Sequence, residues 1–143
     1  MSIRGITDAN LSRWVAANAG ATDDEINALT LASPHPLPNT YLSLLRSANG
    51  GEADIAAGTR CDASYLVLWA SSEVVPFNSD YELHEYAPAF LAFGSNGGGE
   101  LFAFDTRISG DSVFMLPMIG MSNNDGVLFA DSMDAFARRI AAA

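Results

Sequence analysis

Apolar residues return every three or four positions in several stretches of this chain, the spacing that gives a helix one buried face. In one stretch Thr22 is followed three places later by Glu25, the pattern of a capping box at a helix start. Pro38 can preset the first turn of the next stretch, and Asp131 or Ser132 can cap the last one. The pattern predicts helices over residues 8–19, 22–33, 38–48 and from 131 onward, one or two helical turns over 71–78, and a stiff proline-rich elbow over 34–38.

The period of the apolar residues changes from helical to extended in the second half of the chain. Residues 65–69 read YLVLW, which is apolar on both faces and predicts a central strand. Shorter apolar runs separated by turn residues follow, and they favour an antiparallel meander. These runs cover 90–93, 101–105, 113–116 and a brief extended stretch at 127–129. Helices followed by strands predict an α+β fold, with an antiparallel sheet of about four to six strands on which N-terminal helices and a C-terminal helix pack.

The composition bounds the domain organisation. Of the 143 residues 49% are hydrophobic and 17% charged, enough to bury one sizeable core, so we expect a single domain over residues 1–143. No run reaches the ~20 apolar residues of a membrane span, and the start lacks a secretory layout, so we expect a cytoplasmic protein with no membrane partner. The single cysteine, Cys61, has no partner for an internal disulfide and no neighbours at zinc-site spacing. We expect Cys61 to be a small buried residue, and we expect neither a metal nor a cofactor.

The charge is strongly unbalanced: 17 aspartates and glutamates face seven arginines, and the formal net charge is -10. A nucleic acid would be repelled by such a surface and would find no basic patch, so we expect no nucleic-acid partner. A basic protein would be attracted to it during association. The alternative is that the acidity only keeps the protein in solution, and the composition by itself favours this alternative.

The acidic residues gather in stretches that also contain tyrosines, an arrangement suited to a basic protein surface with aromatic anchors. The alternative is an ordinary solvated face with Tyr81 and Tyr86 in the core. Further along, Met118 and Met121 flank Gly120 in a predicted loop, where flexible thioethers can adapt to a partner or fill gaps in a core. The candidate partner-binding residues are Glu52, Asp54, Glu73, Asp80, Tyr81, Glu82, Glu85, Met118 and Met121.

The glycine-rich segment 94–100 and two nearby carboxylates are the other candidates for chemistry. The segment is best interpreted as a turn between two strands; a phosphate cradle is the alternative, but the GK[ST] ending is missing and no helix follows. Glu100 and Asp105 would point to opposite faces of one strand, which makes them a poor acid–base or metal pair. We expect Glu100 to accept hydrogen bonds from the loop amides, and Asp105 to cap a turn with Thr106 and Arg107.

Neither histidine suggests a catalytic set. His35 lies between prolines and His84 lies among acidic residues, and no Ser/His/Asp or Cys/His arrangement follows from the spacing. We expect both histidines on the surface and a protein that is not an enzyme, although sequence spacing leaves open a set assembled from distant parts of the chain.

Three ordered groups of residues resemble the signature of the SUKH superfamily. They are Leu37, Pro38, Tyr41, Asn49, Gly50 and Gly51; then Pro88, Phe90, Gly94, Gly97, Gly98, Gly99, Glu100 and Asp105; then Phe136 in the closing segment. The resemblance covers about residues 22–142 and implies a SUKH-like α+β fold. This superfamily includes Smi/Knr-like regulators of fungal cell-wall synthesis and bacterial immunity proteins encoded beside polymorphic toxins.

The resemblance implies two alternative functions, both non-enzymatic. One is an immunity protein that blocks a cognate toxin, commonly a nuclease, through a complementary acidic surface. The other is a regulatory or scaffolding module that bridges proteins without inhibiting a toxin. Either way the expected partner is a protein with a basic surface, and the domain itself is expected to be a monomer or weak dimer.

Overall fold

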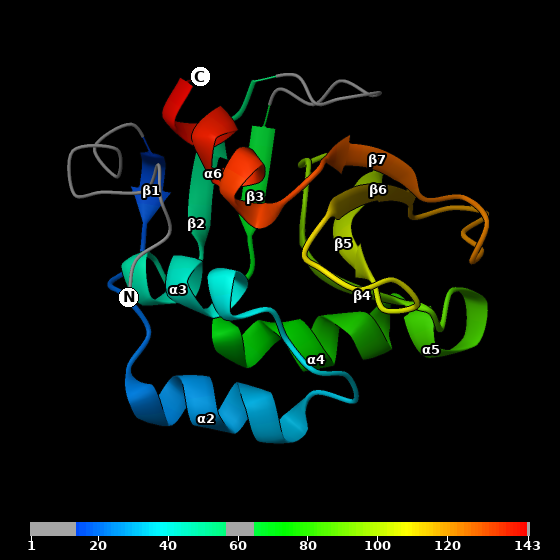
Figure 1. Ribbon diagram of the computed structural model, residues 1–143, viewed down its shortest axis with the longest axis horizontal. Helices are drawn as coiled ribbons and strands as arrows, with labels where there is room; N and C mark the ends of the chain where they lie inside the picture. The colour runs from blue at the N-terminus through cyan, green and yellow to red at the C-terminus, as the bar shows by residue number, and fades with distance from the viewer. Residues whose placement is uncertain (1–13, 57–64, 143) are drawn as a thin grey trace.

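The computed structural model describes residues 14–56 and 65–142, and its centre is one seven-stranded antiparallel sheet (Figure 1). The strands lie in the sheet in chain order, so consecutive strands are neighbours throughout. They are β1 (Trp14–Ala17), β2 (Gly51–Asp54), β3 (Tyr65–Leu68), β4 (Phe90–Ser95), β5 (Glu100–Asp105), β6 (Val113–Pro117) and β7 (Val127–Ala130). The α+β class is confirmed, with slightly more strands than expected.

The helices of the described residues follow the predicted pattern from residue 22 onward, with two differences. They are α2 (Asp23–Ala32), α3 (Asn39–Ser47), α4 (Ser71–Asp80), α5 (Leu83–Tyr86) and α6 (Met133–Ala142). The capping box is present: the Thr22 amide donates to Glu25 Oε1 at 2.9 Å, and the Glu25 amide donates to Thr22 Oγ1 at 3.2 Å. α4 is longer than predicted and α5 was not predicted, because Pro76 and the mixed polarity of the segment hide the helical period. None of these helices is both long and apolar enough to cross a membrane.

The first predicted helix is wrong where it can be compared with the structure. Residues 14–17 form β1, which pairs with β2, while residues 8–13 and Cys61 lie outside the described residues. Trp14 is 7% exposed, whereas the other three residues of β1 are exposed, so the pairing with β2, and not an alternation of burial, makes this segment a strand. β2 was missed because only Ala53 of its four residues is buried.

Aromatic side chains from helices and strands form the centre of the core. The ring of Tyr41 in α3 lies 5.3 Å from that of Phe93 in β4 and 5.4 Å from that of Phe104 in β5. The ring of Phe136 in α6 lies 5.6 Å from Phe93 and 5.2 Å from Phe102. Because both helices contact Phe93, α3 and α6 cover the same face of the sheet, and they also contact each other.

Where β3 stops pairing with β4, a side chain of α4 forms hydrogen bonds with the free edge of β4. β3 is in register with only the last two residues of β4. Beyond that point Asn78 Oδ1 accepts the Ala92 amide at 2.9 Å, and Asn78 Nδ2 donates to the carbonyls of Ala92 at 2.8 Å and Val74 at 2.7 Å. The Asn78 amide therefore replaces a neighbouring strand and fixes α4 against β4. α2 packs along α4 (Figure 1).

Candidate protein-interaction surface

The turn from α4 into α5 carries a compact group of exposed acidic and aromatic residues. We call Asp80, Tyr81, Glu82, Glu85 and Tyr86 the acidic corner; all five are exposed. The turn forms because α4 ends at Asp80 while Leu83, only 2% exposed, is drawn into the core. Within the described residues, none of the three carboxylates forms an ion pair. All of these residues except Tyr86 were predicted from the sequence as partner-binding candidates.

Tyr81 is held in place by a buried aromatic ring. It stacks on Trp69, with centroids 5.9 Å apart and planes 7° from parallel, and Phe77 packs edge-on against the same indole at 5.1 Å. Trp69 is buried while Tyr81 remains 39% exposed and Tyr86 52% exposed. The alternative that these two tyrosines belong to the core is therefore wrong. A ring fixed on one side and exposed on the other suits a rigid anchor.

Glu82 has a left-handed backbone, with φ 60° and ψ 37°. It is the one non-glycine residue with positive φ among the described residues. Its amide donates to the Ser79 carbonyl at 3.0 Å, and its carbonyl accepts the amides of Glu85 at 3.1 Å and Tyr86 at 3.0 Å. A side chain in this region costs roughly 1–2 kcal/mol, and such strain is typical of functional sites.

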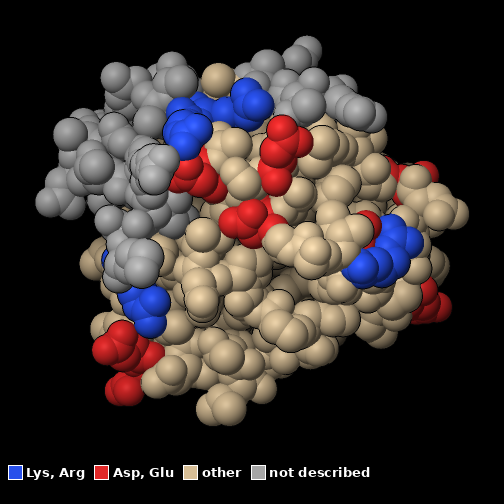
Figure 2. Space-filling view, viewed as in Figure 1, with Lys and Arg blue, Asp and Glu red and all other residues tan. Residues whose placement is uncertain are grey.

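Two predicted surface residues, Glu52 and Asp54, lie on a different element. Both are exposed on β2, where Glu52 Oε1 accepts a hydrogen bond from Tyr65 Oη at 2.8 Å. That hydrogen bond to a carboxylate raises the pKa of the Tyr65 phenol. On the face shown in Figure 2 the carboxylates are scattered in small groups, and most of the surface is uncharged. The predicted acidic surface is therefore divided, and only one part forms the corner.

Glu73 has a structural partner at the start of α4. Its Oε1 accepts the Ala70 amide at 2.9 Å, and the residue is half-buried. It precedes Asp80 by seven helical residues, about 10 Å along the axis. The structure thus separates Glu73 from the acidic corner.

Met118 and Met121 do not form an exposed loop surface. Met121 is 7% exposed, and Met118 is half-buried against the core. Ile119, between them, is 92% exposed. Of the two alternatives, filling a gap in the core fits Met121 better, because the β6–β7 connection folds its thioether inward, while Met118 is only partly covered.

The glycine-rich segment is a turn between β4 and β5, as predicted. Gly97 has φ +76°, a conformation that side chains rarely adopt. Asn96 Oδ1 accepts the amides of Gly98 at 2.9 Å and Glu100 at 3.2 Å. The expectation that Glu100 accepts the loop amides is wrong: its carboxylate accepts a hydrogen bond from Asn96 Nδ2 at 3.2 Å. Asn96 performs the capping because an asparagine can reach the amides two residues on.

Asp105 and Arg107 form a two-pronged pair at the far end of β5. Arg107 Nε lies 2.9 Å from Asp105 Oδ1 and Nη2 lies 2.9 Å from Oδ2, while the Arg107 amide donates to Oδ1 at 3.0 Å. The predicted turn is confirmed for Arg107. These hydrogen bonds lower the pKa of Asp105. Glu100 lies five residues away along the strand, about 17 Å, so the two carboxylates do not form a site. In the described part of the chain no three His, Cys, Asp or Glu side chains are grouped to hold a metal ion.

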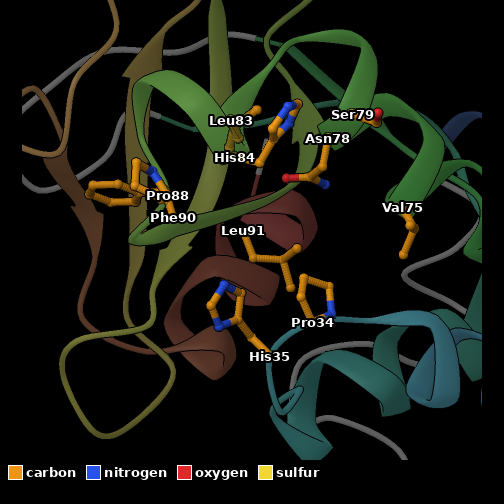
Figure 3. Close-up of a pocket in the computed structure, with 10 residues that line it drawn as sticks. All are labelled: Pro34, His35, Val75, Asn78, Ser79, Leu83, His84, Pro88, Phe90 and Leu91. Carbon is orange, nitrogen blue, oxygen red and sulfur yellow. The ribbon is translucent and has the colours of Figure 1, made fainter.

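Both histidines line one groove, which the sequence did not reveal. The groove has a volume of about 470 Å³ and lies between the elbow at Pro34 and His35, the second half of α4, the start of α5 and the beginning of β4 (Figure 3). We call it the elbow groove. His84 is exposed, as expected, and His35 is half-buried. No sequence signal points to this groove, because its walls come from four separate segments.

A family model places the chain among known proteins. The model of the SMI1 / KNR4 family (SUKH-1) matches residues 20–139. The chain belongs to this family. A search of curated proteins returns no match. The expected superfamily is thus confirmed, over nearly the range predicted from the motifs.

In this SUKH-1 chain the Asn49–Gly50 pair of the first motif joins several elements. Asn49 Oδ1 accepts the Ser71 amide at 2.7 Å and Asn49 Nδ2 donates to Glu25 Oε2 at 3.2 Å. Gly50 has φ +89°, and a Cβ there would lie 2.8 Å from the Ala70 nitrogen. The pair therefore allows α3 to end against the start of α4, which is a structural role.

Tyr41, also in the first motif, is fully buried in α3. Its hydroxyl has no hydrogen-bond partner among the described residues, and burial raises the pKa of this phenol. Leu37 packs partly buried against the core just before it. The motif residue Phe90 is buried and also lines the elbow groove, beside the exposed Pro88.

Proposed function

We propose that this SUKH-1 domain is an immunity protein that binds and neutralises a cognate toxin through its acidic corner. The single observation that carries the proposal is that one turn holds both the exposed Tyr81, stacked on Trp69, and three carboxylates that form no ion pair with any described residue. Charged groups of one sign speed the encounter with a partner of opposite sign, and a rigid aromatic ring supplies anchoring area.

A nuclease is the toxin class that this surface fits best. An enzyme that cleaves nucleic acid must present a basic channel to the phosphate backbone. The carboxylates of Asp80, Glu82 and Glu85 are exposed on a short segment and complement such a channel. The mechanism is blockade: the domain covers the channel and excludes the substrate, and it needs no catalytic group of its own.

The net charge of -10 supports the same proposal, since it attracts a basic protein at long range. Long-range attraction alone does not select a contact surface, however. The acidic corner is preferred over Glu52 and Asp54 because it combines charge with fixed aromatic rings and a constrained backbone at Glu82.

The test is co-expression with the product of the gene immediately upstream in a susceptible host, followed by copurification. The proposal expects that product to be toxic alone, and to be tolerated and copurified when this domain is present. Toxicity without rescue and without a complex would contradict the pairing. A stable complex with no toxic product would favour the regulatory module instead.

A further inference from the structure

The elbow groove has an apolar floor and the size of a binding pocket. Leu83, Phe90 and Leu91 line it while each is no more than 3% exposed, so they are packed from beneath and contribute only their outer surface. A volume of about 470 Å³ falls in the range of roughly 300–1,000 Å³ that binding pockets span.

The polar groups of the groove are few and lie on its walls. Asn78 lines it, but both N–H groups of its side-chain amide already donate to Val74 and Ala92, so it has no donor left for an occupant. The imidazoles of His35 and His84 have no hydrogen-bond partner within the described residues. Figure 3 shows them on opposite sides of the groove, with Leu91 between them. An occupant therefore meets apolar surface with a polar group on either side.

The groove and the acidic corner share one wall. Ser79, Leu83 and His84 line the groove, and they alternate along the chain with Asp80, Glu82 and Glu85. Among the residues that the structure describes, no arginine lines the groove. The three acidic residues do not line the groove themselves, but each is next to a lining residue in the chain, so they place negative charge near this wall. An acidic occupant would be repelled. An apolar side chain with basic neighbours would bury apolar surface in the groove and place its positive charges near the carboxylates.

We infer that the elbow groove receives an apolar anchor of the partner protein, a Leu, Met or Phe side chain flanked by Lys or Arg. The inference rests on the proposed function, because it assigns a second contact to the same basic partner. The anchor packs on the accessible apolar residues of the lining, Pro34, Val75 and Pro88, above the buried floor, and its basic neighbours contact the acidic corner. Buried central anchors surrounded by charged contacts are the usual source of affinity in protein complexes.

The test is a selection of displayed random peptides on the immobilised full chain, which needs no toxin. The expected consensus is one large apolar residue flanked by Lys or Arg. The Ser79→Trp variant fills the groove from its α4 wall and should weaken the enriched peptides about tenfold or more. Ser72→Trp is the matched control, since Ser72 is exposed on the same helix but does not line the groove. A circular dichroism melt of both variants checks that they remain folded.

Each outcome of the selection decides the inference. No consensus, an acidic or proline-rich consensus, or equal binding by Ser79→Trp and wild type would overturn it. This result can be told apart from a failure of the proposed function. If Ser79→Trp protects the host from the toxin as well as wild type does, the role of the groove is rejected and the immunity function stands. Selection of basic-flanked peptides by a chain that protects the host from no toxin would support the groove and contradict the immunity function.

Discussion

The side chain of Asn49 caps α4, a helix that begins 22 residues later: Asn49 Oδ1 accepts the amide of Ser71 at 2.7 Å. Ala70 occupies the N-cap position of α4 and has no side-chain acceptor, so the cap must come from elsewhere. Glu73 supplies the other half by accepting the Ala70 amide. The start of α4 is thus fixed from the residues that follow α3, and the last residue of α4, Asp80, is the first of the acidic corner.

Replacing Asn49 with Ala should therefore lower the free energy of unfolding by about 1–2 kcal/mol, because the Ser71 amide loses its acceptor. Urea denaturation measures the change. Asn27→Ala is the control: Asn27 is exposed on α2, and its side chain makes no hydrogen bond among the described residues. That variant should stay within about 0.5 kcal/mol of wild type. Equal effects of the two substitutions would contradict the capping role.

Tyr41→Phe should stabilise the protein by about 1 kcal/mol, because it removes a buried hydroxyl that has no described partner and leaves the ring in place. The matched control is Tyr65→Phe, which removes a hydroxyl that donates to Glu52 and should give no gain. Thermal unfolding compares them. A loss of stability in Tyr41→Phe would mean that the hydroxyl has a partner in solution.

Glu82→Gly should preserve or raise stability, by up to about 1 kcal/mol, while it weakens binding. Glycine accepts the left-handed backbone without the side-chain clash, although it gains freedom in the unfolded chain. Glu85→Gly removes the same charge from α5, where the backbone is helical, and should cost about 1 kcal/mol. Chemical denaturation of both variants tests this. The strain argument fails if Glu82→Gly loses as much as Glu85→Gly.

The pair of Asp105 and Arg107 should make stability depend on acidity. Because hydrogen bonds from Arg107 lower the pKa of Asp105 in the folded state, the pair stabilises the fold above the unfolded-state pKa of about 4. This contribution is lost as the pH falls through the lower, folded-state value. Asp105→Asn should thus be less stable than wild type at neutral pH, and the difference should shrink on acidification. Urea titrations at several pH values measure the difference in free energy of unfolding between Asp105→Asn and wild type. A difference that does not change with pH would contradict a lowered pKa of Asp105.

Much of this fold could be predicted from the sequence because its signals are local. The capping box at Thr22 and the apolar spacing of α3 and α6 act over a few residues. β1 and β2 escaped prediction because they are short, and their pairing with each other and with β3 makes them strands.

The candidate site shows the same limit. The charges of the acidic corner could be found because they are close in the chain. The support of Tyr81 by Trp69 and the elbow groove depend on segments brought together only by the fold. The two alternatives for Met118 and Met121 stayed open for the same reason, because the spacing of the methionines does not say which way a loop turns.

The most direct test of the central claim measures association of the copurified upstream product with two charge-reversal variants. Glu82→Lys with Glu85→Lys alters the acidic corner, and Glu52→Lys with Asp54→Lys changes the net charge by the same amount on β2. The corner variant should associate at least about tenfold more slowly, with a weaker dependence on salt, and the β2 variant should stay near wild type. Equal rates for the two variants would contradict the account, because the attraction would then come from net charge and not from the acidic corner.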